Sequence, residues 1–256
     1  MLEAVFSRYD TFIFVFIRTM SVVAAIPFFS GRTVPLQVRM GLALSLAVFF
    51  IPVVGVTATL PSDPASLALG IAREALIGIS LGMTVKFVFA GVELAGQLAG
   101  MQMGFALANV LDPQTNSQLS VVSQFTNILA IFLFFSLDMH LMFIAALKES
   151  FDFIPPYGFL VTEKVVDGLF SMSSGIFSLA LKLAAPVVVA VFLANIAMGV
   201  LARTVPQLNV FVVGFPITIT LGLFIMIFSM PFIVSTISQV FVGLSYDMVN
   251  MVRISR

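Results

Sequence analysis

The stretch LAAPVVVAVFLANIAMGVLA, residues 183–202, decides the fold class. It runs for 20 residues without a charged side chain. About 20 predominantly apolar residues are what an α-helix needs to cross the hydrocarbon core of a bilayer. The next uncharged run, residues 204–246, spans 43 residues and contains Pro206, Pro216 and Pro231. Because proline kinks or breaks a helix, this run is predicted to be a broken helix or a helical hairpin.

Similar apolar runs cover the rest of the chain. They are residues 11–29, interrupted only by Arg18, residues 40–62, residues 75–92, interrupted only by Lys86, and residues 113–137. A hydropathy count of all these runs gives about six membrane spans. The sequence therefore predicts an all-α integral membrane protein.

The composition of the chain supports this class and excludes others. Of 256 residues, 60% are hydrophobic and 9% are charged, against about 25% charged residues in soluble domains. Twelve Lys and Arg balance twelve Asp and Glu, and the mean hydropathy is +1.15. A soluble enzyme, a disordered protein and a nucleic-acid-binding protein all fit poorly. The chain is expected to lie in a membrane, within a larger hydrophobic assembly, or both.

Glycines recur at intervals of four residues in one region. Gly78 and Gly82 form one pair, and Gly96, Gly100 and Gly104 form a second series. On a helix this spacing makes a smooth face that lets another backbone approach closely. The approaching helix belongs either to a partner subunit or to a hairpin within this chain, and the sequence leaves both open.

A polar segment, residues 109–124, separates two very apolar stretches. Irregular polar backbone at membrane depth is tolerated only where it is buried in protein or lines a wet cavity. The segment is therefore either the lining of a channel or a plain surface loop.

Five charged side chains lie within or beside the apolar runs: Arg18, Lys86, Glu93, Asp138 and Lys182. Charges inside membrane segments are costly and are often functional, so one interpretation is an ion or proton relay. The favoured interpretation is that they extend to the membrane surface or pair with a partner subunit, because the apolar runs contain no cluster of three or more carboxylates.

The sequence contains few residues that could act in catalysis. Residues 78–82 match the pattern G-x-S-x-G around Ser80, but that nucleophile motif needs a strand and a sharp turn, and here it falls in a helical run. The chain has one histidine, His140, and no cysteine. We therefore predict no enzymatic activity, no cofactor and no metal site.

Two motifs go beyond general hydrophobicity. Residues 96–105 read GQLAGMQMGF and precede Asp112-Pro113, and residues 206–216 read PQLNVFVVGFP. Both resemble the FliR/SctT family of type III secretion export-apparatus proteins, and the first favours its flagellar branch. The N-terminal segments at residues 14–27 and 30–35 are also similar to that family, as is the segment from Ser150-Phe151 to Ile154-Pro155. The resemblance therefore covers essentially the whole chain.

The resemblance implies a fold and a function. The fold is a single export-gate domain over residues 1–256, built of long bent helical hairpins, with a FliP-like part at about 1–180 and a FliQ-like part at about 181–256. One copy would join FliP-like and FliQ-like subunits in the channel through which unfolded flagellar proteins cross the bacterial inner membrane. FlhB-like and FlhA-like components of the flagellar basal body are implied as further partners, besides membrane lipid and the exported proteins as transient substrates.

The resemblance also assigns residues to roles. A channel plug would include the following positions in the polar segment: Asn109, Asp112, Pro113, Gln114, Asn116 and Gln118. Helix packing and assembly would involve Gly96, Gly100, Gly104, Pro206, Asn209, Gly214 and Pro216. The alternative function is transport of a small molecule or ion, which would need inverted repeats and midplane sites in broken helices. The broken run at 204–246 gives that alternative weak support, and no internal repeat is evident.

Overall fold

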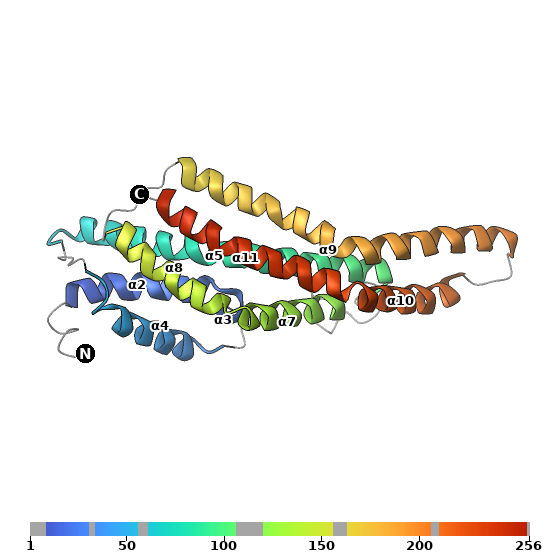
Figure 1. Ribbon diagram of the computed structural model, residues 1–256, viewed down its shortest axis with the longest axis horizontal. Helices are drawn as coiled ribbons and strands as arrows, with labels where there is room; N and C mark the ends of the chain where they lie inside the picture. The colour runs from blue at the N-terminus through green and yellow to red at the C-terminus, as the bar shows by residue number, and fades with distance from the viewer. Residues whose placement is uncertain are drawn as a thin grey trace. The chain divides into compact units, whose positions relative to one another are not determined.

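Every regular element that the structure describes is an α-helix (Figure 1). The computed structural model describes residues 9–30, 34–55, 61–105, 120–155, 163–205 and 210–254. Its helices are α2 (Tyr9–Ala25), α3 (Pro27–Ser30), α4 (Leu36–Phe50), α5 (Pro64–Met103), α7 (Val121–Ser136), α8 (Met139–Phe153), α9 (Glu163–Thr204), α10 (Val210–Phe228) and α11 (Met230–Ile254). The predicted all-α class is confirmed.

The chain divides into two compact units. Unit 1 comprises residues 1–87, 138–173 and 241–256, and unit 2 comprises residues 88–137 and 174–240. Each unit combines segments from both sides of residue 180, so these units are not the predicted parts 1–180 and 181–256. That division rests on resemblance to two other proteins rather than on compactness, and it stays a prediction.

Unit 1 contains a close contact between α2 and α5. A Cβ atom added to Gly78 of α5 would lie 2.5 Å from the Arg18 carbonyl oxygen and 2.6 Å from the Ser21 Cβ of α2. One turn later, Gly82 lies against Ala25. Helix α4 packs against α2. The first glycine pair thus faces a helix of the same chain.

Helix α5 begins at a well-formed cap in unit 1. Pro64 takes the first helical position, where its missing N–H costs nothing, and Asp63 precedes it. The Ser66 backbone N–H donates to Asp63 Oδ2 at 3.0 Å, and the Ser66 hydroxyl donates to the same oxygen at 2.9 Å. These bonds favour the ionised form and lower the pKa of the Asp63 carboxyl.

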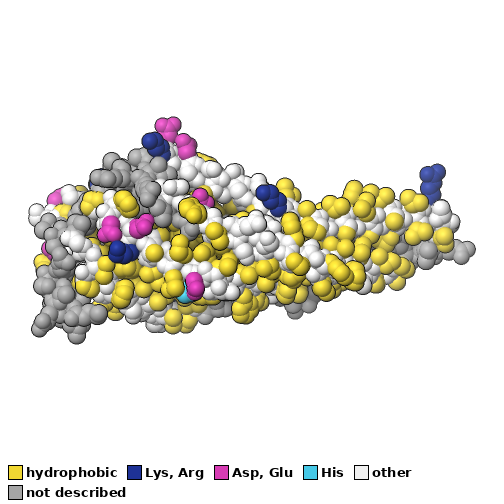
Figure 2. Space-filling model, in the orientation of Figure 1, with side chains coloured by type: hydrophobic (Ala, Val, Ile, Leu, Met, Phe, Trp, Pro, Cys, Tyr) yellow, Lys and Arg dark blue, Asp and Glu magenta, His cyan; other side chains and the backbone are white. Residues whose placement is uncertain are grey.

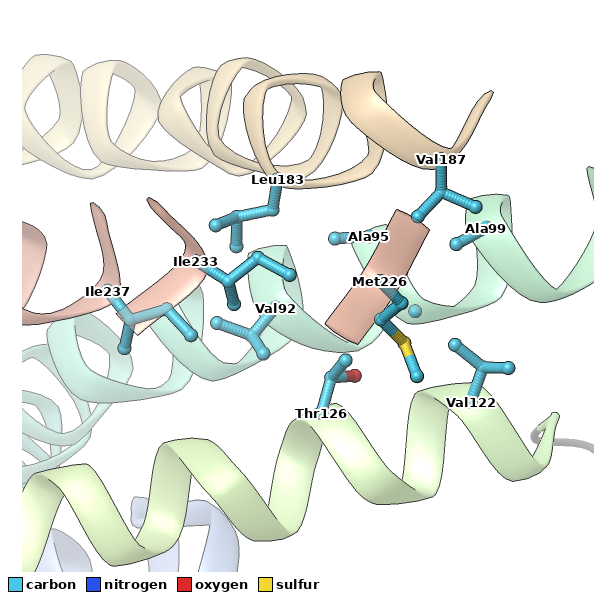
Figure 3. Close-up of a pocket in the computed structure, with 11 residues that line it drawn as sticks. Val92, Ala95, Ala99, Val122, Thr126, Leu183, Val187, Met226, Ile233 and Ile237 are labelled. Carbon is cyan, nitrogen blue, oxygen red and sulfur yellow. The ribbon is translucent and has the colours of Figure 1, made fainter. Parts of the chain in front are cut away.

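Five helices of unit 2 share an apolar core. Side chains from each of them point into a small cavity (Figure 3): Val92 of α5, Thr126 of α7, Leu183 of α9, Met226 of α10 and Ile233 of α11. The cavity measures about 20 Å³, which is room for about one water molecule. Unit 2 therefore has a core of its own.

The long uncharged run at 204–246 is broken, as predicted. Residues Val212–Phe228 and Met230–Met248 meet at an angle of 58°. The break falls at Ser229, and Pro231 follows in the first turn of α11, where proline is tolerated. Pro216 lies inside α10, and Pro186 lies inside α9, so proline alone does not end these helices.

The count of about six spans is too high for the described residues. They contain two helices long and apolar enough to cross a membrane, α5 and α9, or up to four spans if each of two bent helix pairs counts as one. Helices α5 and α9 are 40 and 42 residues long, whereas α2 and α4 have only 17 and 15 residues. Apolar side chains nevertheless predominate on the face that Figure 2 shows, where charged side chains form a few separate patches.

Candidate functional site

Gly104 ends α5 just before the predicted plug. Its φ is +100°, a conformation that favours glycine. The Gly104 N–H donates to the Met101 carbonyl at 3.1 Å, and the Phe105 N–H donates to the Gly100 carbonyl at 3.0 Å. This pair of bonds is the Schellman motif, a common helix stop. Gly104, predicted as a packing residue, thus also fixes where the helix ends.

Helix α10 holds the last turn of α5 from the side. The Thr218 hydroxyl of α10 donates to the Met103 carbonyl at 3.0 Å, and Thr218 is buried. The Met103 side chain is also fully buried, and a Cβ atom added to Gly222 of α10 would lie 2.5 Å from its Cγ. The end of α5 is therefore tied to α10 by both a hydrogen bond and close packing.

Helix α7 begins next to the same part of α5. Ser120 is its N-cap and accepts from the Ser123 N–H at 3.1 Å. The Ser120 hydroxyl donates to the Gly96 carbonyl at 3.3 Å, and the Ser123 hydroxyl donates to the Glu93 carbonyl at 2.9 Å. Both helices that border residues 106–119 are thus joined to each other by side-chain hydrogen bonds.

Gly96 and Gly100 of α5 face α7, whereas Gly104 lies against the Phe215 ring of α10. A Cβ atom added to Gly96 would meet the Ser123 Cα and would lie 2.5 Å from the Thr126 hydroxyl oxygen. One added to Gly100 would lie 2.5 Å from the Ser120 hydroxyl oxygen. In this chain the two glycines let α5 and α7 form a tight antiparallel hairpin. A role for them in contacts with neighbouring subunits stays a prediction.

Several predicted residues lie outside the described part of the chain. All six plug positions do so (Asn109, Asp112, Pro113, Gln114, Asn116 and Gln118), as do Pro206 and Asn209. Of the remaining packing residues, Gly214 in α10 faces the sulfur of Met198 in α9, 3.5 Å from its added Cβ atom. These two helices lie side by side (Figure 1). Pro216 is exposed.

One of the five charged candidates, Arg18, forms a buried cluster in unit 1. Its Nε donates to Glu74 Oε2 at 2.6 Å, and both side chains are 1% exposed. Its Nη1 donates to the Ser150 carbonyl at 2.6 Å and its Nη2 to the Ile154 carbonyl at 3.1 Å. The guanidinium also lies 4.5 Å from the centre of the Phe151 ring. Arg18 of α2 thus caps the C-terminal turn of α8, while Glu74 of α5 balances its charge.

The other charged candidates do not share this environment. Lys86, Asp138 and Lys182 are exposed, whereas Glu93 is half-buried and accepts a hydrogen bond from Gln97 Nε2 at 3.3 Å. The partner that Arg18 uses, Glu74, was not among the candidates. A buried arginine requires a carboxylate, but no short-range pattern in the sequence indicates which of the twelve acids supplies it.

The G-x-S-x-G match has no catalytic geometry. Ser80 lies in the interior of α5, and its hydroxyl donates to the Leu76 carbonyl at 2.8 Å, as serines within helices often do. Among the described residues, no group of three or more His, Cys, Asp or Glu side chains could hold a metal ion.

Comparison with known proteins agrees with the helical, apolar architecture. Residues 9–244 match the family model described as bacterial export proteins, family 1. The flagellar biosynthetic protein FliR of Bacillus subtilis is 34% identical over 246 residues, which cover 94% of this chain and 93% of that protein. FliR of Escherichia coli is 34% identical over 85% of this chain and 83% of its own length. FliR of Pectobacterium carotovorum is 35% identical over 83% and 81%, respectively. The chain therefore belongs to family 1 of the bacterial export proteins, as a FliR-type component of the flagellar export apparatus.

Proposed function

We propose that this chain is a structural subunit of the flagellar export gate. Together with FliP-like and FliQ-like subunits it forms the channel through which unfolded flagellar proteins cross the bacterial inner membrane, within the basal body. The observation that carries the proposal is the family match over residues 9–244. FlhB-like and FlhA-like components are its further partners, and it acts without catalysis.

The surface of unit 2 supports the proposal that the chain is part of a larger assembly. The second half of α9 exposes a run of large apolar side chains: Val189, Phe192, Leu193, Ile196, Val200 and Leu201. Such a continuous apolar surface requires a cover of lipid or protein. Sister subunits of a membrane complex supply that cover.

The hydrogen-bonded hairpin of α5 and α7 supports a plug role for the segment it borders. Gly104 stops α5 and Ser120 starts α7, and each end is fixed to neighbouring backbone. A polar segment held at both ends is suited to closing a channel, because its ends stay in place when its middle is displaced. We assign the closing contacts to the predicted positions: Asn109, Asp112, Pro113, Gln114, Asn116 and Gln118.

Deletion of residues 109–118 tests the plug. Because Phe105 and Ser120 stay joined to their helices, we expect the shortened chain to assemble at the wild-type level and to make the membrane leak ions. Membrane conductance and export of flagellar proteins are the measurements. A control chain with the ten residues replaced by Gly and Ser separates segment length from side-chain chemistry. A tight membrane with normal export contradicts the plug assignment.

A further inference from the structure

A groove in unit 1 runs beside the close contact of α2 and α5. It measures about 410 Å³ and is lined from α2 by Met20, Ser21, Ala24 and Ala25 and from α5 by Ile79, Met83 and Lys86. The α2 side of the groove is built mainly of small side chains. Gly78 and Gly82 hold the two helices in contact. The two helices that line the groove are therefore fixed relative to each other.

Among the described residues that line this groove, Lys86 alone is charged, and its charge is positive. Lys86 is exposed, and no described side chain pairs with its ammonium group. The other polar lining group is the Ser21 hydroxyl, which donates to the Ile17 carbonyl at 2.8 Å. The nearest acids along α5 are engaged elsewhere, Glu74 with Arg18 and Glu93 with Gln97. The groove therefore complements a ligand that is apolar and carries one negative charge.

The position of Lys86 favours a protein helix over a lipid as this ligand. Lys86 lies 22 residues after Pro64 and 17 residues before Met103, well inside a helix apolar enough to span a membrane. A lipid phosphate belongs at the membrane surface, whereas a carboxylate can be carried at any depth by a helix. Small side chains such as Ala24 and Ala25 also allow a second helix to approach closely.

We propose that this groove receives a helix of a sister membrane subunit and that an Asp or Glu of that helix pairs with Lys86. An apolar cover without an acid would bury an unpaired ammonium group, which is strongly unfavourable. This inference rests on the proposed function, because it names the chemistry of one contact within the export gate.

Charge reversal in the assembled complex tests the pairing. The tagged chain is produced together with the FliP-like and FliQ-like proteins of the same organism, and the complex is purified in detergent. We expect Lys86→Glu to lower the yield of sister subunits per tagged chain by about tenfold or more, the scale of losing one partner of a buried charge pair. Lys182→Glu is the matched control, because Lys182 is an exposed lysine on α9 outside the groove. Helix content and thermal unfolding of each chain alone verify that it folds.

A second step identifies the partner residue. Each Asp and Glu of the two sister subunits is changed in turn to Lys in the presence of Lys86→Glu, and one of these changes is expected to restore the complex. Wild-type yield from Lys86→Glu, an equal loss from Lys182→Glu, or failure of every acid replacement would overturn the pairing. A wild-type chain that recovers neither sister subunit would instead contradict the proposed function.

Discussion

Arg18 shows at the scale of a single residue what a buried charge requires. Its side chain is 1% exposed, and it bonds Glu74 of α5 and the last turn of α8, so one residue of α2 connects three helices. The sequence favoured two positions for this charge, the membrane surface or a partner subunit. The structure provides a third, a buried ion-paired cluster inside unit 1.

Removing Arg18 should destabilise unit 1 strongly. In Arg18→Ala the Glu74 carboxylate stays buried without its partner, so we expect the free energy of unfolding to fall by about 3–5 kcal/mol. Lys148→Ala is the control, because it breaks an exposed pair with Asp152 at 3.5 Å and should cost about 1 kcal/mol or less. Denaturant unfolding of the chain in detergent measures both. Equal free energies of unfolding for the two variants would show that the buried cluster does not stabilise unit 1.

The close contact at Gly96 gives a second prediction at the scale of a single residue. In Gly96→Ala the new methyl group meets backbone atoms of Ser123, so α5 and α7 must separate, and overpacking of this kind costs about 1–3 kcal/mol. Gly175→Ala provides the matched control. Gly175 lies inside α9 with nothing within 4 Å of an added Cβ atom, and alanine there should stabilise the helix by about 1 kcal/mol. Thermal unfolding should move in opposite directions, and a shift in the same direction would contradict the packing described here.

At the scale of elements, the sequence predicted helix type well and helix ends poorly. Apolar runs placed α5, α9 and the broken α10–α11 pair correctly. Periodicity did not show that the run at 75–92 belongs to a 40-residue helix, because that helix is apolar on most sides and includes Arg73, Glu74 and Lys86. The end of α5 depends on Gly104 and on Thr218 of α10, which lies 115 residues after Met103, and no local pattern contains such a contact.

The bond from Thr218 gives a prediction at the element scale. Thr218→Val keeps the shape of the side chain but leaves the Met103 carbonyl without the hydroxyl, which should cost about 1–3 kcal/mol for a buried acceptor. The amides of Gly104 and Phe105 should then exchange faster with deuterium than in wild type. Thr220→Val, at an exposed position of α10, should leave them unchanged. Wild-type protection in Thr218→Val would show that α10 does not hold the end of α5.

At the scale of the whole molecule, the low charge content has two explanations. Helices α5 and α9 are suited to lipid, and the exposed apolar side chains of α9 are equally suited to protein neighbours. The sequence predicted both environments, and the proposed function assigns the exposed face of α9 to protein neighbours. The count of about six spans exceeds the two to four that the described residues offer, because hydropathy does not show how long each helix is, and α2 and α4 have only 17 and 15 residues.

The composition of the complex purified from membranes tests the central claim most directly. The chain is tagged and isolated in mild detergent, and the mass of the intact assembly is measured. We predict one copy of this chain with FliP-like and FliQ-like subunits in a single complex. Recovery of the chain alone or as a homo-oligomer, with uptake of a small solute by liposomes that contain only this chain, would contradict the export-gate account.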